Sequence, residues 1–346
     1  MKHIAIDLGS KKSQVCIRDS KGSILKEVRV KTLDLKKLIE SEEPANIVME
    51  ASSEAFHVAR QMTLLKHKVT VVPSVLSRAL AVGARGVKTD LKDAQALSHA
   101  SCSIAELPSV YVPPQDVQEM RELVHGRRFL VGQRTRTINS IRGWGRCRLL
   151  SIKSGTSPTF GARLEEAMGA TQIPGHIEAR LKVLETLNQQ IAVVTKEIRD
   201  AAKRRKVSQL LQTVPGVGPQ VSTAFEAAIG TPERFQSAAA VTSYLGLTPG
   251  ENSSGERERK THITKAGYSE LRCLLVLAAH VAMQRRKDEP IVQWALKVEV
   301  TRGKQKAVVA LARKMAGVMW AVWKRSEPYD AKRAAKAVEP GVTPPK

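Results

Sequence analysis

Four acidic residues have the types and the spacing needed to hold divalent metal ions. Asp7 and Glu50 each end a short apolar, strand-like run, where a side chain can project from the edge of a sheet. Asp90 and Asp93 are three residues apart, so a helix would place both on one face. Four such carboxylates can hold two Mg²⁺ or Mn²⁺ ions about 4 Å apart, one activating the attacking oxygen and one stabilising the leaving oxygen. The pattern predicts in-line displacement at a phosphodiester.

The same acids have a plainer interpretation, which the sequence leaves open. Asp90 precedes an apolar-periodic run and could cap a helix together with Thr89. Asp7 and Glu50 could be solvated acids at strand ends. Glu54, one turn into the next helix, competes with Glu50 for a place in the cluster.

A Gly- and Ser-rich loop, GENSSGERERK, supplies a second candidate group. Its Ser253 and Ser254 precede Gly255, and a serine beside glycine in a cationic loop could attack a phosphodiester while cations stabilise the charge on phosphorus. A polar turn is the alternative explanation of Asn-Ser-Ser-Gly. The cations of this segment are Arg257, Arg259, Lys260 and Lys265.

The whole chain of 346 residues is strongly basic. It has 56 Lys plus Arg against 33 Asp plus Glu, a formal net charge of +23. Such an excess favours a polyanion, because each phosphate contact releases condensed counterions. DNA or RNA is therefore the predicted partner.

Arginine dominates the helical segment 121–148, which has eight arginines and a single acid, Glu122. Arginine suits bidentate phosphate contact, whereas a solvated helix face, the alternative, usually mixes both signs. The predicted nucleic-acid contacts in this segment are Arg121, Arg127, Arg128, Arg134, Arg136, Arg142 and Arg146.

Cysteine usage and hydropathy exclude several other classes. The four cysteines, at positions 16, 102, 147 and 273, form no C-x-x-C pair, so neither a zinc knuckle nor a disulfide framework is expected. The start, MKHIAIDLGSKKS, has no apolar signal core, and no apolar run is long enough to span a bilayer. We expect a cytoplasmic protein with no membrane partner, associated with the nucleoid when on DNA.

The first part of the chain reads as a mixed α/β sheet. Five strand-like runs, KHIAIDLG, SQVCIRD, ILKEVRV, NIVME and VTVVP, alternate with helical signals later in the segment. Tight turns between the first three predict antiparallel hairpins, and the later strand–helix alternation predicts parallel additions. We assign this domain to residues 1–112.

Helical patterns follow, and residues 113–206 are expected to form an arm. The Arg-rich helix would pair as a coiled coil with a heptad-like helix from Ile177 to Lys206, whose leucines and isoleucines fall on one side. A Gly/Ser/Pro-rich insert, Ser151 to Pro174, would separate the two helices.

A third, mainly helical domain is expected at residues 207–325. It opens with LLQTVPGVGPQVSTAFEAAIG, where Gly216 and Gly218 resemble the turn of a helix-hairpin-helix that brings backbone amides close to a phosphate. An ordinary glycine-rich turn is the alternative. Residues 326–346, rich in Lys, Ala and Pro, are expected to be a disordered tail.

Together these features resemble a known family. The four carboxylates in this order, the Arg-rich helices, and YLGLTPGENSSG followed by ITKAGYSELR are similar to the DEDD transposases of insertion sequences, the RNA-guided bridge recombinases. The resemblance extends from Asp7 to about Trp323. The last motif is specific, because Leu-Gly-Leu-x-Pro, Ser-Gly, Ile-x-Lys-x-Gly and Leu-Arg occur together at tight spacing.

The resemblance implies a RuvC-like domain of RNase H fold, a coiled-coil arm and a C-terminal domain with a nucleophilic serine. By position, the four carboxylates match the metal-binding tetrad, and Ser254, before Gly255, matches the nucleophile, with Ser253 as the alternative. Gly267-Tyr268 stands where the family usually has Gly-Asn or Gly-Asp, which puts a role for that side chain in doubt.

The resemblance also implies the course of the reaction and its partners. The serine would form a covalent phosphoserine link to double-stranded donor and target DNA. A tetramer would pair one subunit's carboxylates with another's serine, with two metal ions in each composite site. A structured noncoding RNA would select the DNA sequences by base pairing.

Two other classes fit parts of the sequence. IAIDLGS looks like the first phosphate loop of the actin, sugar-kinase and Hsp70 superfamily, but no second Gly-rich phosphate loop follows. A catalytically silent nucleic-acid-binding protein would explain the charge and leave the four carboxylates without a role.

Overall fold

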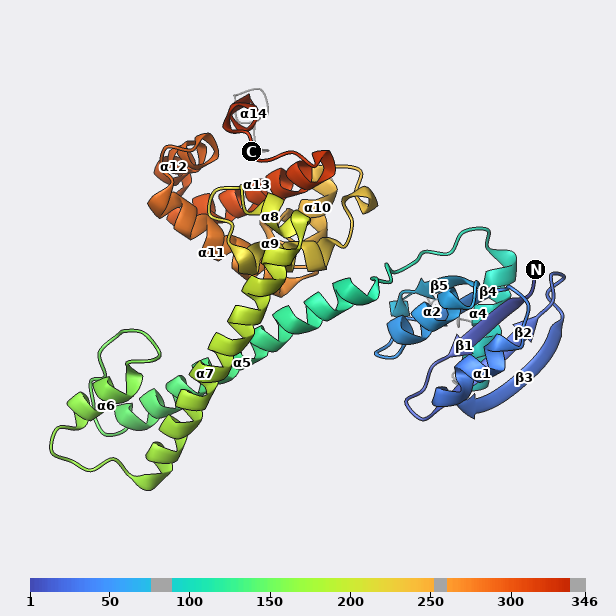
Figure 1. Ribbon diagram of the computed structural model, residues 1–346, viewed down its shortest axis with the longest axis horizontal. Helices are drawn as coiled ribbons and strands as arrows, with labels where there is room; N and C mark the ends of the chain where they lie inside the picture. Colours follow the sequence, from blue (N-terminus) through green and yellow to red (C-terminus); the bar gives the residue numbers. More distant parts are fainter. Residues whose placement is uncertain (76–88, 252–259, 337–346) are drawn as a thin grey trace. The chain divides into compact units, whose positions relative to one another are not determined.

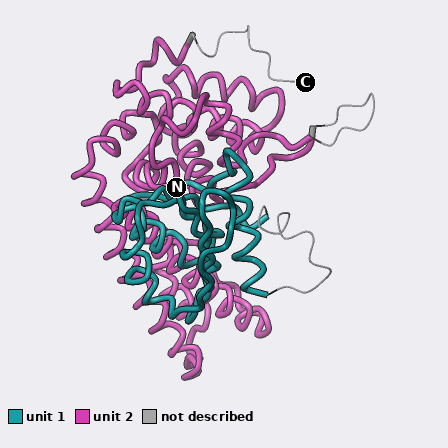
Figure 2. Tube along the Cα trace, turned by 90° about the vertical axis from the view of Figure 1, so that its right-hand side faces the viewer, with its two compact units in different colours: residues 1–114 teal, residues 115–346 magenta. Residues whose placement is uncertain are grey.

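A computed structural model of the chain describes residues 1–75, 89–251 and 260–336. These residues divide into two compact units, 1–114 and 115–346 (Figure 2). The finer division of the second unit into an arm and a separate domain stays a prediction. Each unit is described by itself.

The first unit is a five-stranded mixed sheet with helices on both faces (Figure 1). Its strand order is β3-β2-β1-β4-β5, with the first three strands antiparallel and β4 and β5 parallel to β1. This confirms the mixed α/β sheet. The elements are β1 (His3–Asp7), β2 (Lys12–Arg18), β3 (Ile24–Lys31), η1 (Thr32–Asp34), α1 (Leu35–Glu40), β4 (Asn46–Glu50), α2 (Ala55–Leu64), β5 (Lys68–Val72) and α4 (Asp90–Ser103).

The two faces of this sheet differ because alternate strand residues point to opposite sides. One face carries large aliphatic side chains, such as Ile4 and Met49, and these pack against α1 and α2. The other face carries Ala5, Val48 and Val72, which pack against α4. The smaller side chains let α4 lie close to the strands.

Two long helices form the arm of the second unit, α5 (Gln115–Arg146) and α7 (Gly175–Arg204). They lie side by side, and the segment between them contains a short helix, α6 (Phe160–Met168) (Figure 1). Four of the five buried residues of α7 recur every seven positions, at Ile177, Leu184, Ile191 and Ile198, and the fifth is Ala202. This repeat packs α7 against α5. The supercoil expected of a coiled coil stays a prediction.

The rest of the second unit is a helical body built around α13, which packs against α10, α11 and α12 (Figure 1). The mostly helical character of this region is confirmed. Among the described helices, none has both the length and the apolarity needed to cross a membrane. The elements are α8 (Lys206–Leu211), α9 (Pro219–Ile229), η2 (Pro232–Arg234), α10 (Ala238–Tyr244), β6 (Pro249–Glu251), β7 (Lys260–Ile263), α11 (Ser269–Arg285), α12 (Pro290–Arg302), α13 (Lys304–Arg325) and α14 (Ala331–Lys336).

The C-terminal segment differs from the expected disordered tail. Residues 331–336 form α14, and Ala334 is buried in the core of the helical body. The backbone N–H of Tyr329 donates to Thr213 Oγ1 at 2.9 Å, which holds the approach to α14 in place. The rest of the predicted tail, 337–346, lies outside the described residues.

An ion-pair network joins the arm to the helical body. Arg205, between α7 and α8, donates to Glu226 Oε1 of α9 at 2.6 Å and to Asp116 Oδ2 of α5 at 3.0 Å. Ser208 Oγ donates to the second oxygen of Glu226 at 2.9 Å. The Glu226 side chain is only 3% exposed, so its charge depends on these partners.

We expect Glu226→Ala to lower the free energy of unfolding of the second unit by about 2–4 kcal/mol, because it leaves Arg205 and Ser208 without their shared acceptor. All four tryptophans lie in this unit, so tryptophan fluorescence during urea denaturation measures the change. Glu166→Ala is the matched control, because the Lys153–Glu166 pair is exposed and should contribute less than about 1 kcal/mol. Equal losses for the two variants would show that the Arg205 network does not stabilise the junction.

Candidate active site

Asp7 and Glu50 emerge together from one edge of the first unit's sheet. The parallel strands β1 and β4 are paired up to Ile6 and Met49, so the two acids follow at the same level. Because residues alternate between faces, both acids belong to the face on which Ala5 packs against α4. The two carboxylates therefore share an edge and a face.

Contacts along α4 fix its direction across this face. Near its C-terminal end, Ser101 Oγ lies 2.8 Å from the Nδ1 atom of His3, at the start of β1. At its N-terminal end, Asp90 accepts from Arg29 Nη2 at 3.0 Å, and Arg29 lies in the same row of the sheet as Asp7. The helix is thus antiparallel to β1, and it begins at the edge where Asp7 emerges.

Asp93 lies on the side of α4 that faces the sheet. It precedes Leu97 by four residues, one helical turn, and Leu97 packs against the strands. Thr89 provides the N-cap of this helix, since its side chain accepts from the backbone N–H of Lys92 at 3.3 Å. Capping by Asp90, the plainer explanation of that residue, is therefore not its role here.

The position of α2 bears on the choice between Glu50 and Glu54. Glu54 is the N-cap residue of α2, and α2 packs against the opposite face of the sheet. Glu50 belongs to the face of α4 and the other acids. The fold thus favours Glu50 as the companion of Asp7.

The serine loop is carried by a hairpin in the second unit. β6 and β7 pair antiparallel, with Glu251 opposite Lys260, so the intervening segment connects two strands. Lys265 follows the hairpin, exposed and with a left-handed backbone (φ 56°). The predicted residues Ser253, Ser254, Arg257 and Arg259, and the side chain of Lys260, lie outside the described part of the chain.

Two glycines close the base of this hairpin. Gly246 has a φ of 63°, and a Cβ there would lie 2.2 Å from the carbonyl oxygen of Ala266. Gly267 has a φ of 69°, and a Cβ there would lie 2.1 Å from the carbonyl oxygen of Tyr244. Only glycine allows the segment before β6 and the segment after β7 to come into contact at these points.

Arg272 fixes the same base from α11. Its Nη1 atom donates to the carbonyl oxygens of Leu245 and Ala266, both at 2.9 Å. Three parts of the sequence motif thus meet at the base of the β6–β7 hairpin: Leu-Gly-Leu, Lys-x-Gly and Leu-Arg. The motif marked the Leu-Arg pair, but this role of Arg272 became apparent only from the fold.

Comparisons with known proteins cover both units. A family model described as Transposase, of the DEDD type of IS110, matches residues 4–144, and that of the Transposase IS116/IS110/IS902 family matches residues 208–293. A putative transposase, y4qE, of Sinorhizobium fredii is 30% identical over 300 residues, which cover 79% of this chain and 74% of that protein. The chain belongs to the IS116/IS110/IS902 family of transposases.

Two further relatives align over nearly their full length. The probable family 20 transposase of Pseudomonas aeruginosa is 28% identical over 341 residues, covering 95% of this chain and 98% of that protein. The transposase for insertion sequence element IS1111A of Coxiella burnetii is 29% identical over 349 residues, covering 95% and 91%. The protein is thus an insertion-sequence transposase, as the sequence motifs indicated.

The donor chemistry of the transposase's four acids fits a hard divalent cation. All four offer carboxylate oxygens, the ligands that Mg²⁺ and Mn²⁺ prefer. In the side-chain positions of residues 1–75, 89–251 and 260–336, no three acidic, His or Cys side chains are close enough to form a ready metal site. Asp90 is paired with Arg29 instead, and both side chains are 59% exposed, so a cation can replace that guanidinium at little cost.

Two of the predicted nucleic-acid contacts have structural partners within the transposase. Arg121 donates to the carbonyl oxygen of Ala227 at 2.7 Å and lies over the Tyr268 ring. Arg127 donates to Thr195 Oγ1 at 2.8 Å, across the arm. Burial lowers the pKa of the Arg127 guanidinium. Arg121 thus ties α5 to α9 of the helical body, and Arg127 ties the two arm helices together.

The other arginines of α5 are more open to a ligand. Arg128 faces Glu270 of α11, whose carboxyl pKa is raised by burial although the positive charge of Arg128 opposes the shift. Arg134 is half-buried, and Arg136 donates to Gln133 of the same helix at 3.3 Å. Arg142 and Arg146 lie at the tip of the arm.

The glycines of the predicted helix-hairpin-helix have different surroundings. Gly216 has a φ of 81°, and a Cβ there would lie 2.6 Å from the carbonyl oxygen of Ala278, so this glycine lets the turn pack against α11. Gly218 is the N-cap residue of α9 and borders open space. Phosphate binding by this turn stays a prediction; of the two glycines, Gly218 is the one that borders open space.

Proposed function

We propose that this transposase cleaves and rejoins DNA with metal ions held by Asp7, Glu50, Asp90 and Asp93, and with Ser254 as covalent nucleophile. One observation supports the metal part: Asp7 and Glu50 end the paired parallel strands β1 and β4, and α4, which carries Asp90 and Asp93 in its first turn, begins at the same edge. The strand order is consistent with the RNase H-like, RuvC-like fold that the sequence resemblance implies.

The carboxylates would divide the work of holding Mg²⁺ or Mn²⁺. When bound, two such ions polarise the phosphodiester and stabilise its attacking and leaving oxygens. Asp7 and Glu50, on rigid strands, provide the fixed ligands. Asp90 and Asp93, in the first turn of α4, complete the set after Asp90 releases Arg29.

The serine part rests on the family resemblance and on the hairpin that presents the loop. The Oγ atom of Ser254 would bond to phosphorus while a deoxyribose oxygen leaves with a proton, and a hydroxyl of the exchanged strand would reverse the step. Ser253 is the alternative nucleophile. Arg257 and Arg259 would stabilise the charge on the phosphoryl oxygens.

We extend the proposal to the partners. Double-stranded donor and target DNA are the substrates, and the net charge of +23 supports their binding. A structured guide RNA would select sequences. A tetramer would combine the carboxylates of one subunit with the serine of another, and the paired arm helices would be coiled coils that help assemble it.

Trapping the covalent intermediate tests this function. Protein incubated with labelled donor DNA and Mg²⁺ is expected to give a protein–DNA adduct, and the phosphoryl mark should map to the tryptic peptide of residues 235–257. Ser254→Ala should lose the adduct, whereas Ser253→Ala should keep it. RNA extracted from the same preparation should contain one discrete transcript if recognition is guided.

Two outcomes would contradict the serine mechanism. Cleaved DNA without any adduct would show that metal-activated water or a DNA hydroxyl attacks directly. Equal adduct formation by Ser254→Ala and by the unaltered chain would place the covalent link elsewhere. Loss of cleavage on chelation of Mg²⁺, by contrast, tests the carboxylates alone.

A further inference from the structure

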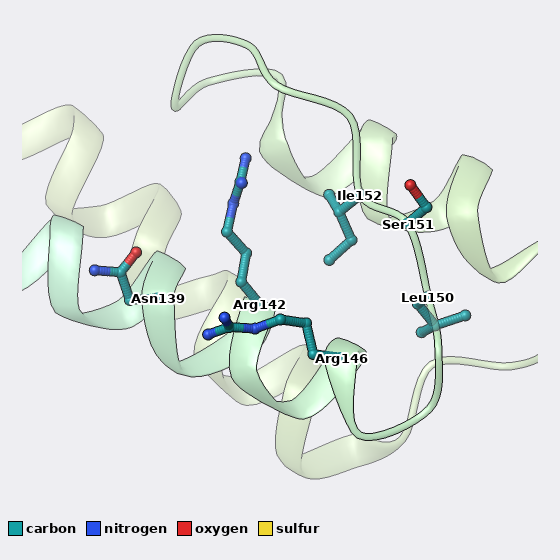
Figure 3. Close-up of a pocket in the computed structure, with 6 residues that line it drawn as sticks. All are labelled: Asn139, Arg142, Arg146, Leu150, Ser151 and Ile152. Carbon is teal, nitrogen blue, oxygen red and sulfur yellow. The ribbon is translucent and has the colours of Figure 1, made fainter.

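The tip of the arm contains a basic hollow of about 430 Å³. It lies between the last turns of α5 and the segment that follows them (Figure 3). We call it the arm-tip hollow. Its lining residues are Asn139, Arg142, Arg146, Leu150, Ser151 and Ile152.

This part of the chain has a uniform charge. Residues 139–163 contain five cations and no Asp or Glu. Three of the five support the surrounding structure: Arg163 donates to the carbonyl oxygens of Lys153 and Thr156, Arg148 stacks 4.6 Å from the centre of the Trp144 ring, and Lys153 pairs with Glu166. The charge inside the hollow comes from the remaining pair of arginines, one turn apart on α5.

These two arginines keep donors available. Arg146 is exposed, and it has no hydrogen-bond or ion-pair partner among the residues that the structure describes. Arg142 makes one long bond, 3.4 Å, to the carbonyl oxygen of Lys153 and lies 5.8 Å from the centre of the Phe160 ring. In Figure 3 the side chain of Arg142 rises between helix and loop, and that of Arg146 extends along α5.

The opposite wall is apolar and firmly positioned. The backbone N–H of Leu150 donates to the carbonyl oxygen of Gly145 at 3.0 Å, which folds the chain back against α5. A Cβ at Gly145 would lie only 3.3 Å from Cδ1 of Ile152, so the glycine lets this wall lie close to the helix. Contacts within the arm itself therefore shape the hollow.

These features match the parts of one nucleotide. Guanidinium groups four residues apart on a helix can grip a phosphate with several parallel hydrogen bonds. Leu150 and Ile152 offer a surface to the face of a base, and Asn139 can donate to and accept from its edge. The volume is within the range of about 300–1,000 Å³ found for small-molecule sites, and too small for a base pair.

We propose that the arm-tip hollow binds an unpaired nucleotide of a single-stranded nucleic acid. Bases in a duplex stay stacked and paired, whereas a loop or a displaced strand offers splayed bases that a protein can enclose. RNA and DNA strands share this chemistry. The proposal is independent of the carboxylate and serine chemistry, because it concerns binding alone.

Binding measured in EDTA, without cleavage, tests the proposal. The probes are a fluorescent 12-nucleotide oligouridine, the matching oligothymidine and a 12-base-pair duplex. Arg146→Ala removes one cation that has no partner in the described part of the chain, and Ser151→Trp fills the hollow without changing charge. Arg199→Ala is the charge-matched control, exposed on α7 about 36 Å from the tip end of that helix (24 residues at 1.5 Å).

Both hollow variants are expected to weaken single-strand binding about fivefold to tenfold at constant salt, and the control less than about twofold. Duplex binding should change little in Ser151→Trp. A 4-thiouridine probe should crosslink to the tryptic peptide of residues 149–153, which carries the apolar wall, and Arg146→Ala should reduce that crosslink. Whichever of oligouridine and oligothymidine binds more tightly identifies the natural ligand as RNA or as single-stranded DNA.

Other results would overturn the proposal. Equal losses in Arg146→Ala and Arg199→Ala would show that binding depends only on total charge. An unchanged affinity in Ser151→Trp, or crosslinks that avoid residues 149–153, would show that the hollow is not occupied. Circular dichroism of each variant distinguishes these results from misfolding.

Discussion

Asp93→Asn is expected to slow DNA strand cleavage by about a thousandfold or more, and Asp7→Asn by a similar factor. Asparagine keeps the size of the side chain and removes the charge that holds a divalent cation. Asp93 is the decisive test, because its role depends on α4 lying antiparallel to β1 with its first turn at the edge where Asp7 emerges.

The control for this prediction removes a carboxylate from the other end of the same sheet. Glu43 is exposed and lies near the start of β4, away from the carboxyl edge of the strands. Glu43→Gln should cleave at the normal rate, and all three variants should bind duplex DNA normally. Cleavage rates are measured on a labelled donor duplex over a Mg²⁺ titration. Full activity of Asp93→Asn at saturating Mg²⁺ would remove α4 from the metal site.

The strands and their ends were predictable because hydrophobic alternation is a local signal. The runs around Ile4 and Ile47 mark β1 and β4, and the acids that end them fall at the strand termini observed. The placement of α4 was not predictable in the same way. It depends on contacts between residues 61 to 98 positions apart, such as those of Arg29 with Asp90 and His3 with Ser101.

Tertiary packing also explains the two helices that the sequence patterns did not reveal. α6 is short, and its evidence is a single pair of buried residues, Phe160 and Leu164, one turn apart in a Gly/Ser-rich segment. α14 has the composition of a solvated tail, yet Ala334 fits against the core because alanine is small enough for close helix packing. In both cases the stabilising partner is remote in sequence.

The arginines show a similar limit. Arginine composition predicts affinity for phosphate, but it does not separate side chains that bind a ligand from those that brace the fold. Arg121 and Arg127 bond to the body and to the other arm helix, whereas Arg146 does neither. Only the positions of the carbonyl and hydroxyl acceptors make this distinction.

Gly267→Ala is expected to destabilise the second unit by about 3–5 kcal/mol, and Gly246→Ala by a comparable amount. A left-handed φ alone costs a residue with a side chain about 1–2 kcal/mol. The remainder is steric, because the added Cβ would lie 2.1 Å from the carbonyl oxygen of Tyr244, or 2.2 Å from that of Ala266. The two chain segments would have to separate at the base of the serine loop.

Gly303→Ala separates the two contributions. Gly303 also has a positive φ, 84°, but a Cβ there would meet nothing within 4 Å. Its ψ is 157°, a backbone region almost restricted to glycine, so its substitution should cost about 1–3 kcal/mol, the conformational part alone. Urea denaturation followed by tryptophan fluorescence reports on the second unit alone, since Trp144, Trp294, Trp320 and Trp323 all belong to it.

The same glycine variants connect stability with chemistry. At a temperature where Gly267→Ala remains folded, a displaced hairpin should still reduce the yield of covalent DNA adduct, whereas Gly303→Ala should give the normal yield. If Gly267→Ala were no more destabilising than Gly303→Ala, the close approach at Tyr244 would not constrain the fold. A normal adduct yield in a destabilised Gly267→Ala would show that the loop is positioned by other contacts, leaving Arg272 as the next residue to test.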